Sequence, residues 1–294
     1  MDSYNKKVKF HLPGLFYFWP GYVQLLDLIS ARPGVLKDNI EIGSIFDSPQ
    51  CIWNGGRLIA SGVWDQDKLI YVRDYMKNKN IPVRFTFTNC LLEEKHTYDT
   101  YGNILLEVFN TGTNEIICNT EVLENYIREK YKNRYKYISS TTKRLNNKDD
   151  QNRELQKDYS LVVLDYEHNQ DIEYLQSIPN KEKCELLCNP VCHPKCPKRV
   201  AHYKNISECQ LNYTIDRMMH CMDAYAEFWK VKHHSPIFIS VEDINNIYIP
   251  MGFSNFKLEG RTTHALDWIE IILYYLIKEN YKDEVRSLLQ LPYR

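Results

Sequence analysis

The sequence lacks the features that mark membrane-spanning and secreted proteins. No run of about 18 apolar residues occurs along its 294 residues, so we expect no membrane span. The opening segment, 1–7, contains no apolar core of a secretory signal peptide. We therefore expect a protein of the reducing cytoplasm that has no membrane partner.

Net charge and turn-forming residues are also scarce. Lys and Arg number 37 against 38 Asp and Glu, which gives a formal charge of −1. That balance argues against a surface that binds polyanions in general, and a nucleic-acid partner would need a local basic patch such as the one at 195–204. Only 11 Gly and 12 Pro occur, which excludes collagen-like and low-complexity chains. With 44% hydrophobic residues, the chain can form a substantial core.

Several catalytic motifs are missing. The sequence has no Gly-x-Ser-x-Gly elbow, no phosphate-binding Walker loop and no His-Glu-x-x-His pair. Serine-triad hydrolysis, P-loop nucleotide hydrolysis and zincin-type proteolysis therefore have no support in the sequence. No Gly-x-Gly-x-x-Gly turn follows the first strand-like run, which weakens a dinucleotide-binding fold.

Short strand-like runs alternate with helical patterns along the chain. In one such pattern, Leu69, Val72 and Met76 share a helix face behind a possible cap at Asp65 or Asp67. Strands that alternate with helices predict a parallel sheet, and eight such units over about 250 residues or more are typical of a (β/α)8 TIM-type barrel. We predict one α/β barrel domain over 1–294, with a doubly wound open sheet as the alternative. The eight expected strands are 9–14, 40–47, 83–89, 115–119, 135–142, 160–166, 184–189 and 256–261.

The segment between the seventh and eighth expected strands, about 190–255, is long for a connection. A long insertion in a compact domain is more often functional than idle. Six of the nine cysteines fall between positions 184 and 221, so most of this cluster belongs to the insertion. An odd number of cysteines on a long chain does not suit a disulfide framework. We therefore expect metal or thiolate chemistry here rather than cross-linking.

The loop around Cys192 and Cys196 is the strongest local feature. Prolines in this loop stiffen it and preset the two thiolates, which favours metal ligation. Cys209 and Cys221 follow, and four thiolates suit zinc or an iron–sulfur cluster. The alternative is that these are free cysteines that pack as small apolar residues.

Polar residues at the strand ends are the candidate site residues, because barrel active sites lie at the carboxyl ends of the strands. Glu259 and Arg261 lie two apart on the last expected strand and so point to one face. They could form a buried ion pair, or act as an acid and an anion anchor, and we expect at least one of them in the pocket. The polar residues at strand ends are His11, Asp47, Thr88, Asn89, Asn119, Thr141, Asp165, Asn189, Glu259 and Arg261.

The turn 54–57 (Asn-Gly-Gly-Arg) follows the second expected strand. Paired glycines let backbone N–H groups approach a ligand, and the arginine can hold a carboxylate or phosphate, although Asn-Gly is also an ordinary turn. His202 could act in acid–base chemistry, ligate a metal or be a hydrogen-bonded structural group. The expected catalytic residues are Glu259, Arg261 and His202. The expected substrate-binding residues are His11, Asn54, Arg57, Asn89 and Asn189.

Three segments form a pattern that resembles a known family. They are Glu-Leu-Leu-Cys-Asn over 185–189, Cys-x3-Cys-Pro-x-Arg-x2-His-Tyr over 192–203, and Phe-Lys-Leu-Glu-Gly-Arg over 256–261. Together they resemble the collagenase-like peptidase family, peptidase family U32, and its barrel relatives. The resemblance implies a TIM-type barrel. Some of those relatives hold an iron–sulfur cluster on four cysteines and take part in oxygen-independent hydroxylation of quinone precursors or RNA bases, while others are peptidases.

By this resemblance, Cys192 and Cys196 match cluster ligands, with Cys209 as a third and Cys221 as a fourth. An iron–sulfur cluster is the implied cofactor and zinc the alternative. We expect a barrel enzyme that acts on a small-molecule or nucleobase-like substrate by hydroxylation-type chemistry. A peptide hydrolase of the same fold and a non-catalytic binding or partner subunit are the alternatives, and a protein partner is expected because relatives can act in pairs.

Overall fold

The computed structural model describes residues 7–60, 62–219, 221, 224–225 and 227–293. Its eight strands are all parallel and form a closed barrel, with β8 paired to β1. The order of strands around the barrel follows their order in the chain, so the predicted (β/α)8 barrel is confirmed and the open sheet is excluded. The strands are β1 (Val8–Pro13), β2 (Ile40–Asp47), β3 (Val83–Phe87), β4 (Glu115–Cys118), β5 (Lys136–Ser139), β6 (Leu161–Val163), β7 (Cys184–Leu187) and β8 (Asn255–Lys257).

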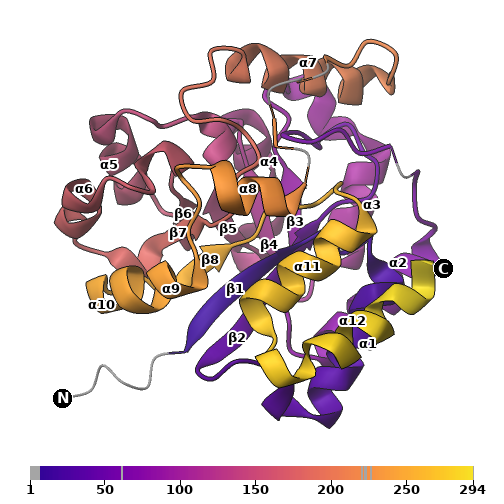
Figure 1. Cartoon of the computed structure of the whole chain (residues 1–294). Coiled ribbons are helices and arrows are strands. Elements are labelled where there is room, and N and C mark those ends of the chain that lie inside the picture. The colour runs from indigo at the N-terminus through magenta and orange to yellow at the C-terminus, as the bar shows by residue number, and fades with distance from the viewer. Residues whose placement is uncertain (1–6, 61, 220, 222–223, 226, 294) are drawn as a thin grey trace.

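Helices follow the strands and surround the barrel (Figure 1). Within the described residues, no helix has the length and apolar character needed to cross a membrane. After the first six strands come α1 (Trp19–Ala31), α2 (Gln66–Asn78), α3 (Thr100–Val108), α4 (Glu121–Tyr131), α5 (Lys148–Gln156) and α6 (Ile172–Ser177). After β7 come α7 (Arg199–Asn212), α8 (Phe228–His234), α9 (Val241–Asp243), a π-helical turn (Ile244–Tyr248) and α10 (Ile249–Met251). After β8 come α11 (Ala265–Leu276) and α12 (Lys282–Gln290).

The helices form where the sequence pattern places an apolar face against the barrel. In α2, Leu69 and Val72 are fully buried, and the Asp65 carboxylate accepts a hydrogen bond from the Lys68 N–H, so Asp65 is the predicted cap. Strand β3 is buried along its whole length, because helices cover its outer face and the barrel interior its inner face.

The barrel interior has two layers of different character. Toward the amino ends of the strands lies a polar cluster around Arg84. Its guanidinium group is 2.6 Å from Glu115 Oε2, 2.6 Å from Glu185 Oε2 and 3.0 Å from His11 Nδ1. Above it lies an apolar layer, which separates the polar cluster from the mouth of the barrel. This layer is formed by Phe46, Ile117, Ile138 and Val163.

A glycine makes room for the histidine of the polar cluster. The register of β1 against β2 shifts between Phe10 and His11, so that His11 pairs with Ser44 and Gly43 is passed over. A Cβ atom at Gly43 would lie 2.7 Å from His11 Cε1. The bulge therefore lets the imidazole turn inward, where Nδ1 lies 2.8 Å from the Ser44 hydroxyl.

Candidate functional site

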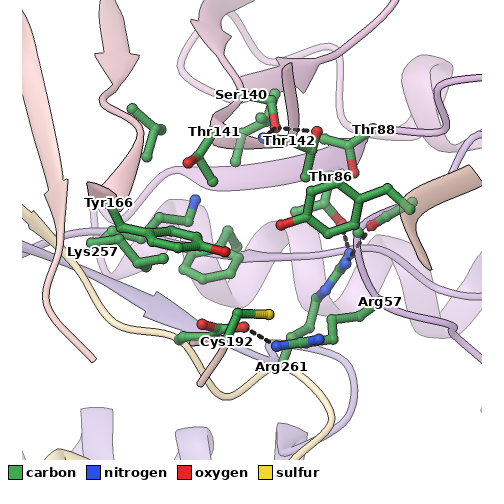
Figure 2. Close-up of a pocket in the computed structure, with 18 of the residues that line it drawn as sticks. Arg57, Thr86, Thr88, Ser140, Thr141, Thr142, Tyr166, Cys192, Lys257 and Arg261 are labelled. Atoms are coloured by element: carbon green, nitrogen blue, oxygen red, sulfur yellow. Dashed lines mark hydrogen bonds and ion pairs between the residues drawn. The ribbon is translucent and has the colours of Figure 1, made fainter. Parts of the chain in front are cut away.

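A cavity of about 90 Å³ lies at the carboxyl ends of the strands, the end of a (β/α)8 barrel that carries active sites. Figure 2 shows its side chains pointing inward from several strand ends and loops. Its polar lining combines cations, one carboxylate, a thiol and many hydroxyl groups. These residues are Arg57, Thr86, Thr88, Ser140, Thr141, Thr142, Tyr166, Cys192, Tyr203, Lys257, Glu259 and Arg261.

Arg261 is a cation of this cavity that has only neutral partners. Its guanidinium group donates hydrogen bonds to the Thr86 hydroxyl and to the Gly55 carbonyl, and the residue is 6% exposed. Within the described residues, no carboxylate forms an ion pair with it. Burial lowers the pKa of Arg261 to about 10, against the opposing charge of Asp47, so the group stays charged at neutral pH. A buried cation with neutral partners favours an anion beside it.

The glycine turn after β2 is pressed against the loop after β3. A Cβ atom at Gly55 would lie 2.3 Å from the Thr88 carbonyl oxygen, so only glycine fits there. The Asn54 side-chain amide holds the turn by donating to the Pro49 carbonyl at 2.7 Å. This approach places the Gly55 carbonyl 2.6 Å from Arg261 Nη2. The turn therefore positions the arginine.

Glu259 and Arg57 form an ion pair at the rim of the cavity, with side chains 20% and 24% exposed. Burial opposes the charge of Arg57, but Glu259 overcomes it and raises the pKa of that arginine. The carboxylate also accepts a hydrogen bond from the Val191 N–H at 3.0 Å. Asn189, in the loop after β7, braces the backbone of Glu259 with hydrogen bonds of 2.7 Å and 2.9 Å. Glu259 is thus paired with Arg57 rather than with Arg261.

Two buried hydroxyl groups of the lining are Thr141 Oγ1, which has no hydrogen-bond partner within the described residues, and Tyr166 Oη, which lies beside the Cys192 thiol and the Arg199 guanidinium group. Tyr166 is 2% exposed, and the Arg199 guanidinium lies 4.2 Å from the centre of its ring. Arg199 is itself held by an ion pair with Asp165. Because buried polar groups in folded proteins are nearly always hydrogen-bonded, these hydroxyls can bond to polar atoms of water or of a bound molecule.

Lys257 lies at the floor of the cavity, where β8 ends. Its ammonium group is 3.8 Å from the centre of the Phe46 ring and 3.6 Å from Glu185 Oε1. Burial lowers the pKa of Lys257 to about 7, although Glu185 pulls it upward. A large fraction of this lysine is therefore an uncharged amine at neutral pH.

The residues expected to bind substrate fall into two groups in the structure, those that line the cavity and those that lie outside its lining. Arg57 lines the cavity, whereas Asn54, Asn89 and Asn189 lie outside the lining and brace the loops around it. The Asn89 amide ties the loop after β2 to α7 by donating to the carbonyl groups of Ile52 at 2.8 Å and Ser207 at 3.1 Å.

His11 lies in the polar cluster beneath the apolar layer and does not line the cavity. Burial, together with the charge of Arg84, lowers the pKa of His11 to about 3, so the imidazole is neutral at physiological pH. Neighbouring strands supply hydrogen-bond partners for the imidazole, with the Ser44 hydroxyl 2.8 Å from Nδ1.

Three of the four expected thiol ligands share a second, smaller cavity of about 20 Å³. Cys192, Cys196 and Cys221 line it together with His202, whereas Cys209 is buried within α7 and does not line it. Burial raises the pKa of the Cys192 thiol, although Arg57 opposes this, so it is a thiol at neutral pH. In the described part of the chain, no three His, Cys, Asp or Glu side chains converge to hold a metal ion. These donors line one cavity, but within the described residues they do not converge on a common point as metal ligands do.

His202 lies beside the thiols rather than in the main cavity. It is half-buried on α7, and burial, aided by the charge of Arg57, lowers its pKa. Its neighbour Tyr203 lines the main cavity instead.

Sequence reasoning overlooked two groups of the main cavity, Lys257 and Tyr166. Lys257 lies two residues before Glu259, so the same alternation that placed Glu259 and Arg261 on one face also applies to it. The signal that could have identified Lys257 is its place between Phe256 and Leu258, as a lysine within a short apolar strand. Tyr166 had no comparable signal, because a tyrosine after a strand serves packing as readily as binding.

Comparisons with known proteins agree with the fold. No family model matches the chain. An uncharacterized protease of Methanocaldococcus jannaschii is 26% identical over 143 residues, which are 47% of this chain and 42% of that protein, so the match spans less than half of the relative. A solved U32 peptidase superposes with a TM-score of 0.51 at 12% identity, over 88% of this chain and 95% of that one. The predicted resemblance to the collagenase-like peptidases is thus confirmed, and the structural likeness concerns the fold.

Proposed function

We propose that this barrel, with the fold of a U32 peptidase, is an enzyme that binds a small substrate in its mouth through an anionic group, a carboxylate or a phosphate. The observation that carries the proposal is Arg261, a buried cation whose protein partners, Thr86 and the Gly55 carbonyl, are neutral. A buried charge that forms no ion pair is costly, and a bound anion would lower that cost.

The rest of the lining supports a polar ligand of limited size. The Thr141 hydroxyl offers an unused hydrogen bond, the Tyr166 hydroxyl also faces the cavity, and the rim pair of Glu259 and Arg57 can orient a substrate. A cavity volume of about 90 Å³ suits a group of a few heavy atoms, because pockets for drug-sized ligands span about 300–1,000 Å³. A larger substrate, such as a nucleobase-like compound, would place only one end in this cavity.

Calorimetric titration with inorganic phosphate and with pyruvate tests the proposal. We expect saturable binding to the wild-type chain, and at least a tenfold loss of affinity in Arg261→Gln, because charge-assisted hydrogen bonds contribute about 1.5–3 kcal/mol each. Arg134→Gln is the matched control, since Arg134 is exposed and bonds only to Asn110 on the surface. Equal affinities in the wild type and in Arg261→Gln would count against the anion site.

The smaller cavity, which three cysteines line, supports a second proposal, that the protein binds a metal centre. An iron–sulfur cluster used in hydroxylation-type chemistry is the expected centre, and zinc is the alternative. The supporting observation is that Cys192, Cys196 and Cys221 line one cavity. Protein purified without oxygen should then contain iron and labile sulfide, and a Cys192→Ser, Cys196→Ser double variant should lose both. Colourless wild-type protein without iron, sulfide or zinc would remove this proposal.

Peptide hydrolysis is favoured by the names of the compared proteins, an uncharacterized protease and a U32 peptidase. A peptide would bring its terminal carboxylate to Arg261. Cleavage of a peptide library by the wild type but not by Arg261→Gln would support it. Binding of phosphate or pyruvate without any turnover, together with a second chain that co-purifies, would instead favour a non-catalytic partner subunit.

A further inference from the structure

Lys257 is an amine nucleophile in the lining of the cavity that also contains Arg261. Figure 2 shows its side chain among those that line the cavity, together with Tyr166 and Arg261. The ammonium group is held from below by Glu185 at 3.6 Å and packs over the Phe46 ring at 3.8 Å. The amine is thus fixed at the boundary between the apolar layer and the mouth of the barrel.

The surroundings of this lysine favour its uncharged form. Burial is the main cause, and the positive charges of Arg84 and Arg261 act in the same direction, while Glu185 opposes them. A pKa of about 7 leaves a free electron pair on the Lys257 amine in a large fraction of molecules at neutral pH. A lysine desolvated in a pocket beside other cations is a typical activated amine nucleophile.

The cavity also contains hydrogen-bond donors for a carbonyl oxygen and a cation for a neighbouring acid group. The Thr141 hydroxyl is buried without a partner within the described residues, and the buried Tyr166 hydroxyl lies beside the Cys192 thiol and the Arg199 guanidinium group. Both hydroxyls line the cavity and can donate hydrogen bonds to a carbonyl oxygen. Burial raises the pKa of Tyr166, so that its hydroxyl keeps its proton and acts as a donor. Arg261 can hold an adjacent carboxylate or phosphate, which would aim the carbonyl carbon at the amine.

We propose that Lys257 forms an imine with the carbonyl carbon of a small oxo acid bound in this cavity. The inference rests on the proposed function, because the same arginine holds the acid group. It adds a substrate class, an anionic carbonyl compound, and a covalent step.

In this step the electron pair of the Lys257 amine adds to the carbonyl carbon, and the carbon–oxygen π bond becomes an alkoxide held by Tyr166 and Thr141. The alkoxide takes up the proton released from nitrogen, which gives a carbinolamine. Loss of the hydroxyl group with the remaining nitrogen proton releases one water and forms the carbon–nitrogen double bond. The carbonyl compound is the sole co-reactant, and no atom is oxidised or reduced.

Lys37 provides an internal comparison. Burial lowers its pKa to about 8, so it too is a reactive amine, but it lies at the opposite end of the barrel. Its amine is bonded to the Tyr274 carbonyl, and Val8 and Ile40, at the amino ends of β1 and β2, line the cavity around it. A label that reaches Lys257 but not Lys37 therefore reports the site rather than amine reactivity alone.

Reductive trapping tests the inference. The wild-type chain is incubated with pyruvate and sodium cyanoborohydride, digested, and mapped by mass spectrometry. We expect a reduced pyruvate adduct on Lys257, at least tenfold more abundant than on Lys37. Acetone replaces the carboxylate of pyruvate by a methyl group, and it should label Lys257 at least tenfold less. Lys257→Arg should remove the adduct, while Lys136→Arg, at an exposed lysine of β5, should leave it unchanged.

Labelling spread evenly over Lys37 and the surface lysines would overturn the inference, and so would equal labelling by acetone. Because the wild-type map locates the adduct, the test holds even if Lys257→Arg fails to fold. Calorimetric binding of pyruvate that depends on Arg261, without an adduct on Lys257, would refute the imine and leave the proposed function standing. Absence of both binding and adduct would refute both.

Discussion

Replacement of Glu185 by glutamine tests how the barrel interior and the floor of the cavity depend on one buried charge. The Glu185 carboxylate is fully buried and lies 2.6 Å from Arg84, 3.4 Å from His11 and 3.6 Å from Lys257. Glu185→Gln keeps the size of the side chain but removes its charge. Arg84 then retains only Glu115 as an ion-pair partner, and Lys257 retains none within the described residues.

The lowered pKa of Glu185 gives the expected size of the loss in folding stability. Burial alone would raise it, but Arg84, followed by His11 and Lys257, outweighs burial and lowers the value from 4.5 to about 2. At about 1.4 kcal/mol per pKa unit, this corresponds to about 3 kcal/mol of folding stability, present above pH 4.5 and lost as the pH falls toward 2. Removing one partner of a buried ion pair typically costs about 3–5 kcal/mol, which agrees with this value.

Urea unfolding at pH 7 and pH 3 measures the prediction. Glu185→Gln should be less stable than the wild type by about 3–5 kcal/mol at pH 7, and the difference should shrink at pH 3, where the native carboxylate begins to lose its advantage. Glu41→Gln is the matched control, because Glu41 pairs with Lys7 and Lys9 on the surface at 3.7 Å, and it should change stability by less than about 1 kcal/mol. Equal stability of variant and wild type at pH 7, or a difference that persists at pH 3, would refute this reasoning.

Three further predictions follow from the site. Between pH 7 and 10.5, wild-type stability should rise relative to that of Lys257→Met by up to about 1.4 kcal/mol per pH unit. The reason is that the lysine loses its proton near pH 7 in the folded chain and near pH 10.5 in the unfolded chain. Parallel pH profiles of the two proteins in urea unfolding would contradict this. Asn189→Ala should lower the free energy of unfolding by about 1–3 kcal/mol, since it leaves two backbone groups of Glu259 without partners, and an unchanged midpoint in urea would count against that brace. Gly55→Ala should push the turn away from Thr88 and weaken phosphate binding at least about tenfold by calorimetry, whereas wild-type affinity would mean that the turn does not position Arg261.

The barrel could be predicted from the sequence because its physical cause is local. Buried parallel strands form short apolar runs, and helices such as α2 carry an apolar face of helical spacing behind a cap at Asp65. Glu259 and Arg261 both line the mouth as expected, although β8 ends at Lys257 and they lie in the segment that follows it, and Arg57 joins them from the turn after β2. These features depend on spacings of a few residues, which the sequence displays directly.

The remaining site residues depend on contacts between distant segments. His11 is a polar residue of a strand end, but its partners come from β2, β3 and β7, and these partners satisfy it below the apolar layer. Asn54, Asn89 and Asn189 serve the loops rather than the ligand for the same reason. Which polar residue meets another across the barrel is decided by the closed three-dimensional arrangement, and the sequence pattern of one strand does not contain it.

Diffraction from crystals soaked in selenate would test the anion site most directly, because selenium reports the position of a small oxoanion by its anomalous signal. The account predicts a selenium peak inside the cavity, with selenate oxygens in hydrogen-bonding distance of the Arg261 guanidinium group and close to the hydroxyl groups of Thr141 and Tyr166. Crystals that hold selenate on the surface and none beside Arg261 would contradict it.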